Sequence, residues 1–372
     1  MSLLSSLRRT ATLGVVFLSM SVAHRASADS FVVTSTADSD GNSCGTTCTL
    51  RQAINAAIAA SIAAPNDRED IVFDETVFAT KQTIDITGYN NSGAPNVGLP
   101  WIEGNINIIG PSKEDSGVTI RGATPHNYNV FQTRGNNMSI SNLTITGWGI
   151  GLFNRSPHLT LTDCTFENND IGVKTSNTQW LRLKREYEAV QNQAHPGFVP
   201  AFVTNAAVTL NNCTFSDNGQ MGIEHISGAT MVNSCTITGS DKGIRALIGD
   251  LTLSNSLIVG NKTANLYSYD TPDGRVIKYG DQEGVACSFT KVGNNITTGT
   301  AAEAGLDPNG LQDNGGATRT IALMKNSPAV DKGATDLASD QRGQLRAQAG
   351  VADIGAFEYV DAPTTEQNSG QP

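Results

Sequence analysis

The sequence predicts an all-β protein whose central part is a right-handed parallel β-helix, a solenoid built from stacked turns of the chain. Five segments between residues 138 and 258 align with one another at spacings of 21, 49, 22 and 21 residues. Each segment alternates apolar and polar residues, which is the pattern of a strand with one buried face. Gly, Asn, Thr and Ser are abundant and only 16% of the residues are charged, a composition that suits short strands joined by tight turns.

The aligned segments define one strand of each turn. Their matched position is occupied by Leu143, Cys164, Cys213, Cys235 and Ser256. A second short strand follows in most turns, as in Ile171-Gly-Val173 and Met221-Gly-Ile223. One turn cannot bury its apolar face alone, so the turns must stack to make a continuous core.

A row of polar residues lies at one corner of the predicted turns. Asn142, Asp163, Asn212 and Asn255 align there, and Ser234 interrupts the row. Side-chain amides at such a corner can hydrogen-bond along the stack. The alternative is that these residues simply favour turns.

The segment before the repeats predicts a helix over residues 49–63. Thr49 is its expected N-cap, an apolar face contains Leu50, Ile54, Ala57, Ile58 and Ile62, and Pro65 ends it. An open solenoid end exposes sheet edges, so we expect this helix to cap the N-terminal end of the core.

The N-terminus predicts export. Arg8 and Arg9 precede a short apolar run, and Ala26-Ser27-Ala28 is typical of a cleavage site, so we predict a signal peptide ending at Ala28. The alternative is a retained anchor. The mature protein is then expected to be extracellular or periplasmic and to have no membrane span.

The net charge disfavours some partners. The chain carries a formal charge of −10. The predicted signal peptide contains basic but no acidic residues, so its loss makes the net charge more negative. An acidic protein is a poor general partner for nucleic acid or anionic membranes. We expect a monomer, no cofactor and no metal.

Two flanking regions resemble known bacterial domains. Cys44-Gly-Thr-Thr-Cys48-Thr-Leu-Arg51-Gln-Ala resembles the CSLREA domain, with Thr49 and Gln52 in place of that family's Ser and Glu. Four C-terminal motifs resemble the choice-of-anchor Q domain. They are Leu311-Gln-Asp-Asn-Gly-Gly316, Asn326-Ser-Pro-Ala-Val-Asp331, Asp340-Gln-Arg-Gly343 and Asp353-Ile-Gly-Ala-Phe-Glu358. The resemblance implies a bacterial exported or surface β-helix protein, related in shape to pectin lyases and adhesins. It implies no particular reaction.

The cysteines fall into two groups. Cys44 and Cys48 bracket a tight loop in an exported chain, so we expect a disulfide between them. Cys164, Cys213 and Cys235 occupy one stack position. They can form a core row of free thiols or a disulfide between neighbouring turns, because adjacent strands are close enough for either.

These features divide the chain. We expect a signal peptide at 1–28, a CSLREA-like cap at 29–70 and a parallel β-helix at 71–300. A helical insertion at 176–206 interrupts the β-helix. A choice-of-anchor-Q-like region at 301–360 and a disordered tail at 361–372 follow.

The second strand of the repeated turns carries the candidate site. Lys174, Glu224 and Arg245 share one register, and His225 follows Glu224. The insertion leaves just after Lys174 and supplies Trp180, Arg182, Lys184 and Arg185, residue types that stack on sugars and pair with carboxylates. The alternative is a solvated salt-bridge row with no further role.

Three functions remain open on the sequence. The first is an adhesin-like protein that binds polysaccharide or a cell-surface glycan. The second is a polysaccharide lyase or related uronate-active enzyme with Lys174, Glu224, Arg245 and His225 as catalytic residues. The third is a structural envelope component. No adjacent carboxylate pair of the polygalacturonase type, calcium nonapeptide or zinc-protease motif occurs, so the sequence favours the first.

Overall fold

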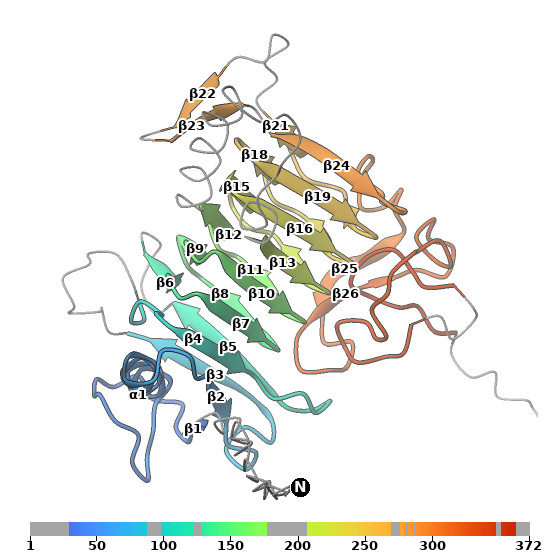
Figure 1. The fold of residues 1–372 in the computed structure, drawn as a ribbon. Helices are drawn as coiled ribbons and strands as arrows, with labels where there is room; N and C mark the ends of the chain where they lie inside the picture. The colour runs from blue at the N-terminus through green and yellow to red at the C-terminus, as the bar shows by residue number, and fades with distance from the viewer. Residues whose placement is uncertain are drawn as a thin grey trace, which may run out of the picture.

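Three parallel sheets form the walls of the central solenoid (Figure 1). The structure is a computed structural model that describes residues 30–87, 98–122, 128–176, 207–268, 276–279, 282–285, 287–346 and 351–361. The predicted signal peptide, the insertion beyond Ser176 and the tail beyond Asp361 lie outside these residues. The predicted fold class, an all-β right-handed β-helix with an N-terminal helix, is confirmed.

The sheets are named A, B and C in the order in which a turn visits them. Sheet A contains β1 (Ser30–Val33), β2 (Glu69–Phe73), β4 (Asn105–Ile109), β7 (Asn137–Ser141), β10 (His158–Thr162), β13 (Ala207–Asn211), β16 (Ala229–Asn233), β19 (Asp250–Ser254) and β24 (Ser288–Val292). Sheet B contains β3 (Lys81–Ile86), β5 (Gly117–Gly122), β8 (Leu143–Thr146), β11 (Thr165–Glu167), β14 (Thr214–Ser216), β17 (Thr236–Thr238) and β20 (Leu257–Ile258). Sheet C contains β6 (Asn129–Thr133), β9 (Ile150–Asn154), β12 (Ile171–Ser176), β15 (Met221–Ser227), β18 (Lys242–Ala246) and β21 (Ala264–Ser268).

Two antiparallel hairpins lie outside the three sheets. One is β22 (Val276–Tyr279) with β23 (Gln282–Val285), and the other is β25 (Leu306–Gln312) with β26 (Thr320–Leu323). Sheet A also begins before the expected boundary at residue 71, because β1 pairs in parallel with β2. The stack therefore includes the segment that precedes the helix.

The interior is filled by the apolar residues of all three sheets, which form one cluster. The rings of Phe166 and Phe215 stack in neighbouring turns with centroids 5.1 Å apart. The repeated glycine of sheet C makes room for them: a Cβ at Gly172 would lie 2.9 Å from the ring of Phe215 and 2.6 Å from the carbonyl oxygen of Gly222. A side chain at this position would push neighbouring turns apart.

The three aligned cysteines lie in this interior as free thiols. Cys164, Cys213 and Cys235 are fully buried. Burial, followed by the neighbouring thiols of Cys164 and Cys235, raises the pKa of Cys213. Buried thiols of this kind pack as small apolar groups.

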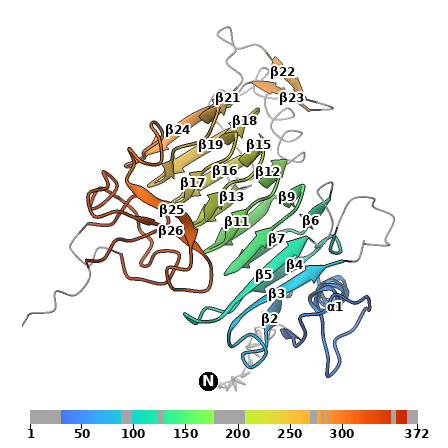
Figure 2. The same ribbon diagram turned by 180° about the vertical axis from the view of Figure 1, so that it is seen from behind.

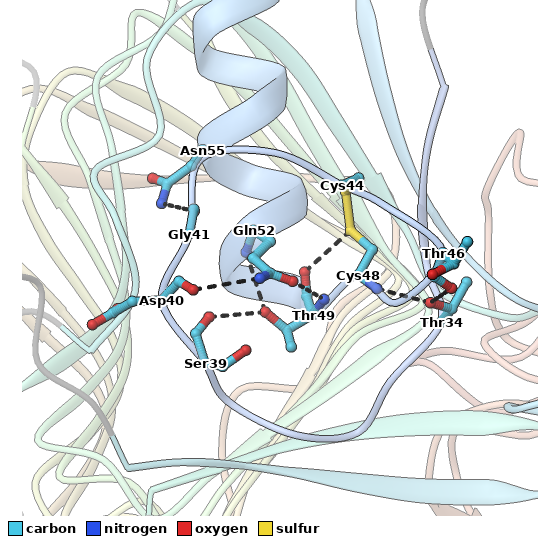
Figure 3. The surroundings of a disulfide bond; sticks show 10 residues. All are labelled: Thr34, Ser39, Asp40, Gly41, Cys44, Thr46, Cys48, Thr49, Gln52 and Asn55. Atoms are coloured by element: carbon cyan, nitrogen blue, oxygen red, sulfur yellow. Dashed lines mark hydrogen bonds between the residues drawn. A yellow bond between two sulfur atoms is a disulfide. The ribbon is translucent and has the colours of Figure 1, made fainter.

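The N-terminal helix α1 (Leu50–Ala63) begins at a reciprocal cap (Figure 3). The backbone N–H of Gln52 donates to Oγ1 of Thr49, and the backbone N–H of Thr49 donates to Oε1 of Gln52. Cys44 and Cys48 form a disulfide just before the cap. Thr49 and Gln52 thus form a capping box.

Helix α1 packs against strands of sheet A at the N-terminal end of the stack (Figure 1). Leu50, Ile54 and Ala57 are fully buried in the interior cluster. The expectation that Ile62 continues this face is wrong, because its side chain is 69% exposed. Ser61 occupies the next position of the 3.6-residue period, and its Oγ accepts a hydrogen bond from the backbone N–H of Asn105.

Residues 301–346 and 351–361 cover the outer face of sheet B (Figure 2). The buried side chain of Gln341 donates to Oγ1 of Thr165 at 2.8 Å and accepts from Oγ1 of Thr214 at 2.6 Å. The backbone N–H of Ala356 donates to Oγ1 of Thr236. The outward threonines of sheet B are buried for this reason, and residues of the C-terminal motifs make the hydrogen bonds of this interface.

The polar corner row is defined by its backbone conformation. Asn142, Asp163, Asn212, Ser234 and Asn255 all adopt the left-handed conformation, with φ between 48° and 55°. Asn and Asp tolerate this conformation better than other non-glycine residues, which accounts for the residue types found at this corner. Within it the side-chain amide of Asn255 donates to Oγ of Ser234.

A stacked asparagine ladder occurs at a different corner, between sheets B and C. The side-chain amide of Asn169 donates to Oδ1 of Asn218 in the next turn, and both side chains are buried. The amide of Asn218 donates in turn to the carbonyl of Phe166. The amide ladder thus lies at the corner that follows sheet B, where the repeat also places polar residues.

Candidate functional site

The three predicted charged residues meet on the outer face of sheet C. Lys174 in β12 pairs in register with Glu224 in β15, and Glu224 pairs with Arg245 in β18. Their chain neighbours Ile223 and Ile244 are fully buried in the interior. Successive side chains on a strand point to opposite faces, so the charged side chains point outward.

The three side chains form a linked ion-pair group. Nζ of Lys174 lies 2.8 Å from Oε2 of Glu224, and Nη2 of Arg245 lies 3.4 Å from Oε1 of the same carboxylate. The side chain of Glu224 is only 3% exposed, whereas those of Lys174 and Arg245 are 18% and 19% exposed. The group is therefore not a solvated row of salt bridges. The carboxylate of Glu224 is buried, and the cations of Lys174 and Arg245 are more exposed than it is.

Cations stacked on aromatic rings extend this group along sheet C. The guanidinium of Arg134 lies 3.3 Å from the centroid of the Trp101 ring, and that of Arg155 lies 4.7 Å from the ring of Phe153. Nζ of Lys174 lies 5.6 Å from the same phenyl ring. Partial desolvation, followed by the charge of Arg155, lowers the pKa of Arg134.

We call this surface the cationic face. It consists of Trp101, Arg134, Phe153, Arg155, Lys174, Glu224 and Arg245. Exposed Arg and Lys beside aromatic rings can bind carboxylates and stack against sugar rings, because a planar guanidinium pairs with a carboxylate in two-pronged fashion.

His225 lies on the other side of its strand, in the interior. It is fully buried, and Nδ1 lies 2.9 Å from Oγ1 of Thr175 and 3.1 Å from Oγ1 of Thr230. Burial lowers the pKa of His225 to about 4, so the ring is neutral at ordinary pH. The structure therefore separates His225 from the cationic face to which the sequence had assigned it.

Sequence reasoning missed Arg134 and Arg155. A signal was present, because the two arginines follow the second strand of successive turns at the 21-residue repeat spacing. Their aromatic partners lie in different parts of the chain: Phe153 belongs to the repeat, whereas Trp101 precedes it. The ligand-binding residues predicted in the insertion, Trp180, Arg182, Lys184 and Arg185, lie outside the described residues.

A second titratable cluster lies where the C-terminal region meets the solenoid. Burial raises the pKa of Asp163 to about 7, Asp340 adds to this effect, and Asn212 and Arg346 oppose it. Nη2 of Arg346 donates to Oδ1 of Asn212 at 2.9 Å. These groups lie inside an interface, so we assign them a structural role.

Two further features are absent from the residues that the structure describes. No group of three or more His, Cys, Asp or Glu side chains in those residues has an arrangement that could hold a metal ion. No helix in the same ranges is long and apolar enough to cross a membrane.

The family match of this chain covers most of the solenoid. Residues 103–303 match the family described as the right-handed β-helix region. Among solved structures, the crystal structure of pectate lyase Pel9A is similar, with a TM-score of 0.39 and 13% identity over 90% of this chain and 97% of that chain. The chain matches no curated protein in sequence.

Proposed function

Since the chain belongs to the right-handed β-helix region family, we propose that it is an exported β-helix protein that binds an acidic glycan through the cationic face. The observation that carries the proposal is the pairing of exposed guanidinium groups with aromatic rings at Arg134 and Arg155, beside the Lys174–Glu224–Arg245 group. An acidic protein that concentrates cations on one face is suited to a ligand that brings carboxylates.

The buried carboxylate of Glu224 has a positioning role in this proposal. A buried charge needs paired partners, and here one carboxylate engages both Lys174 and Arg245. It fixes the two cations relative to each other across three strands. A ligand carboxylate then meets cations that have already lost most of their side-chain freedom, which lowers the entropic cost of binding.

The same geometry favours binding over β-elimination. A lyase needs a side chain that accepts a proton from the sugar, and the ammonium group of Lys174 is engaged with Glu224 instead. His225 is fully buried in the interior and lies on the opposite face of β15. A lyase remains an outcome of the experiment below.

The test measures binding of polygalacturonate and alginate to the full chain and to two pairs of variants. Arg134→Gln with Arg155→Gln removes two exposed cations and leaves no buried charge behind. Lys174→Met with Glu224→Gln removes the Lys174–Glu224 ion pair and, with it, the ion pair between Glu224 and Arg245. We expect each pair to weaken binding at least tenfold while the circular dichroism spectrum and melting temperature of the first pair stay unchanged.

Three results would count against the proposal. Absence of binding to either polymer refutes it. Unchanged binding by the Arg134→Gln, Arg155→Gln variant shows that these ion and ring contacts are structural. Release of unsaturated products, seen as ultraviolet absorbance and lost in the Lys174→Met, Glu224→Gln variant, would identify a lyase. The matched control is Lys262→Gln, which removes an exposed cation that is not part of the cationic face.

The flanking regions support export as part of the proposal. We assign the N-terminal cap to a CSLREA-type domain and residues 301–360 to a choice-of-anchor-Q-type region. Their motif residues hold buried structural contacts: Arg51 binds Asp38 at 2.8 Å, and Asp340 accepts from the guanidinium of Arg342 at 2.7 Å. N-terminal sequencing of the exported protein tests the signal peptide. A mature chain that starts at Met1 contradicts it.

A further inference from the structure

The sequence contains three Asn–Gly pairs, a dipeptide that is open to an internal reaction. They are Asn218–Gly219, Asn309–Gly310 and Asn314–Gly315. The backbone nitrogen that follows an asparagine can attack the carbon of the side-chain amide, and glycine hinders this attack least because it has no side chain. Both reacting groups must leave any arrangement that holds them apart, so the fold decides which of the three pairs can react.

The first pair is held inside the stack of turns. The side chain of Asn218 is fully buried, and its Oδ1 accepts from the backbone N–H and from the side-chain amide of Asn169. Its own amide donates to the carbonyl of Phe166. The attacking group, the backbone N–H of Gly219, donates to the carbonyl of Asn169 at 2.6 Å. Reaction at this pair therefore requires neighbouring turns of the solenoid to open.

The last pair is held by the hairpin of β25 and β26. The side-chain amide of Asn314 donates to the carbonyl oxygen of Thr320 at 2.9 Å and to its Oγ1 at 3.2 Å. Thr320 is itself fully buried. The backbone N–H of Gly315 donates to Oδ1 of Asp313 at 3.3 Å. Both reacting groups are thus engaged, and the amide is fixed to a neighbouring strand.

The middle pair lies in a bulge of β25. Leu306 pairs with Leu323, and the next paired residue, Leu311, pairs with Ile321. Residues 307–310 therefore stand opposite a single residue of β26 and lie outside the paired ladder. A bulge of this kind leaves its extra residues without cross-strand partners, so they can change conformation while the hairpin keeps its register.

The reacting groups of this pair are exposed and are held only locally. Asn309 is exposed, and its side-chain amide donates to Oδ1 of Asp307 at 2.9 Å, within the same bulge. Gly310 has a φ of 70°, and a Cβ placed on it would have no atom within 4 Å. The amide and the nitrogen that attacks it can therefore reorient without displacing another element.

We infer that Asn309 is a site of spontaneous covalent modification, at which the folded protein converts this asparagine to aspartate and isoaspartate. The nitrogen of Gly310 loses its proton and forms a bond to Cγ of Asn309, and the side-chain amide leaves as ammonia. Water then opens the five-membered imide at either of its carbonyl groups. The net reaction consumes one water and releases one ammonia, and it needs no oxidant or reductant.

The modification places a new negative charge on an exposed bulge that already carries Asp307. The isoaspartate product also lengthens the backbone by one carbon. Because residues 307–310 lie outside the paired ladder, both products keep the register of β25 against β26. The modified chain is then a more acidic form of the same fold, and this inference is independent of the glycan binding proposed for the cationic face.

The experiment incubates the full chain at pH 8 and 37 °C, both folded and in guanidinium chloride. Peptide mass spectrometry follows the gain of one mass unit at each Asn–Gly pair. In the folded protein we expect Asn309 to react within about threefold of its rate in denaturant. Asn218 and Asn314 should each react at least tenfold more slowly than in denaturant, because they wait for local opening.

A pair of variants tests the same site by ion-exchange chromatography of the folded protein. Asn309→Gln should stop most of the formation of acidic forms, because the longer side chain would have to close a six-membered ring. The matched control is Asn326→Gln, at an exposed asparagine that no glycine follows, and it should leave this rate unchanged. The inference is overturned if Asn309 reacts no faster than Asn218 or Asn314 in the folded protein, or if the Asn309→Gln protein becomes acidic as fast as the wild type.

Discussion

Replacing Asp163 by Asn tests the interface between the solenoid and its C-terminal region. Asp163 lies in the left-handed corner row, and burial raises its pKa to about 7 in the folded protein. Its carboxyl group therefore binds a proton more tightly when folded than when unfolded. Asparagine has nearly the same shape, tolerates the left-handed conformation and cannot ionise.

The size of the effect follows from the shift. The pKa rises from 3.8 to about 7, and each unit corresponds to about 1.4 kcal/mol, so the folded state loses up to about 4 kcal/mol at alkaline pH. Because the folded-state pKa is raised, this contribution is complete below pH 3.8 and is lost as the pH rises through 7. The variant should equal the wild type near pH 4 and exceed its stability at pH 8.

His225 produces an opposite trend in the same pH range. Its pKa falls from 6.5 to about 4, so its contribution is complete above pH 6.5 and is lost as the pH falls toward 4, by up to about 3 kcal/mol. The two groups nearly cancel in the wild type between pH 4 and 7. In the Asp163→Asn variant the pH dependence due to His225 is no longer offset, so the unfolding free energy of the variant should rise with pH.

The assay is the urea midpoint and melting temperature of both proteins at half-unit steps from pH 4 to pH 8.5. Tryptophan fluorescence reports unfolding, and constant ionic strength removes screening differences. If the Asp163→Asn protein follows the same pH profile as the wild type, the buried-carboxyl explanation is wrong. A profile that falls with pH in the variant would contradict the role assigned to His225.

Three substitutions test the packing of the fold. Ile54→Ala should cost about 2–5 kcal/mol in unfolding free energy because it empties a fully buried position under the cap, and an unchanged urea midpoint would show that α1 does not seal the core. Arg51→Ala leaves the buried carboxylate of Asp38 without its guanidinium and should cost about 3–5 kcal/mol, measured by chemical unfolding, with Arg51→Lys expected to recover only part of it. Phe215→Ala removes the ring stacked on Phe166 and should cost about 3–5 kcal/mol, whereas Phe215→Leu restores most of the buried volume and should cost clearly less; equal losses would contradict the role assigned to buried volume and attribute the whole loss to the ring.

The register of sheet C was predictable from the sequence. Aligning the repeats placed Lys174, Glu224 and Arg245 on neighbouring strands, and the structure brings them into contact. The alternation of buried and outward residues also followed from the pattern, because it depends only on the geometry of an extended chain. The position of His225 followed from the same rule, yet its place beside Glu224 in the chain had suggested a shared site.

The remaining features of the site required distant contacts. Trp101 reaches Arg134 from outside the repeats, so no alignment of the repeats includes it. The burial of Glu224 could not be inferred, since charged residues at outward positions are ordinarily exposed. A strand pattern reports the direction of a side chain and gives no information on what lies over it.

The sequence by itself determined the turn of the solenoid: its length, its inward and outward residues, its capping helix and the corner residues that accept a left-handed backbone. These are local properties, set by the period of a strand and by the intrinsic preferences of Asn, Asp and Gly. The tertiary structure alone decided which outer face is covered and which is open. The C-terminal region binds sheet B through Gln341 and Arg346, more than a hundred residues away from their partners Thr214 and Asn212. Whether an outward threonine lies at a buried interface or on an open surface depends on such contacts, because its own strand presents it in the same way in both cases.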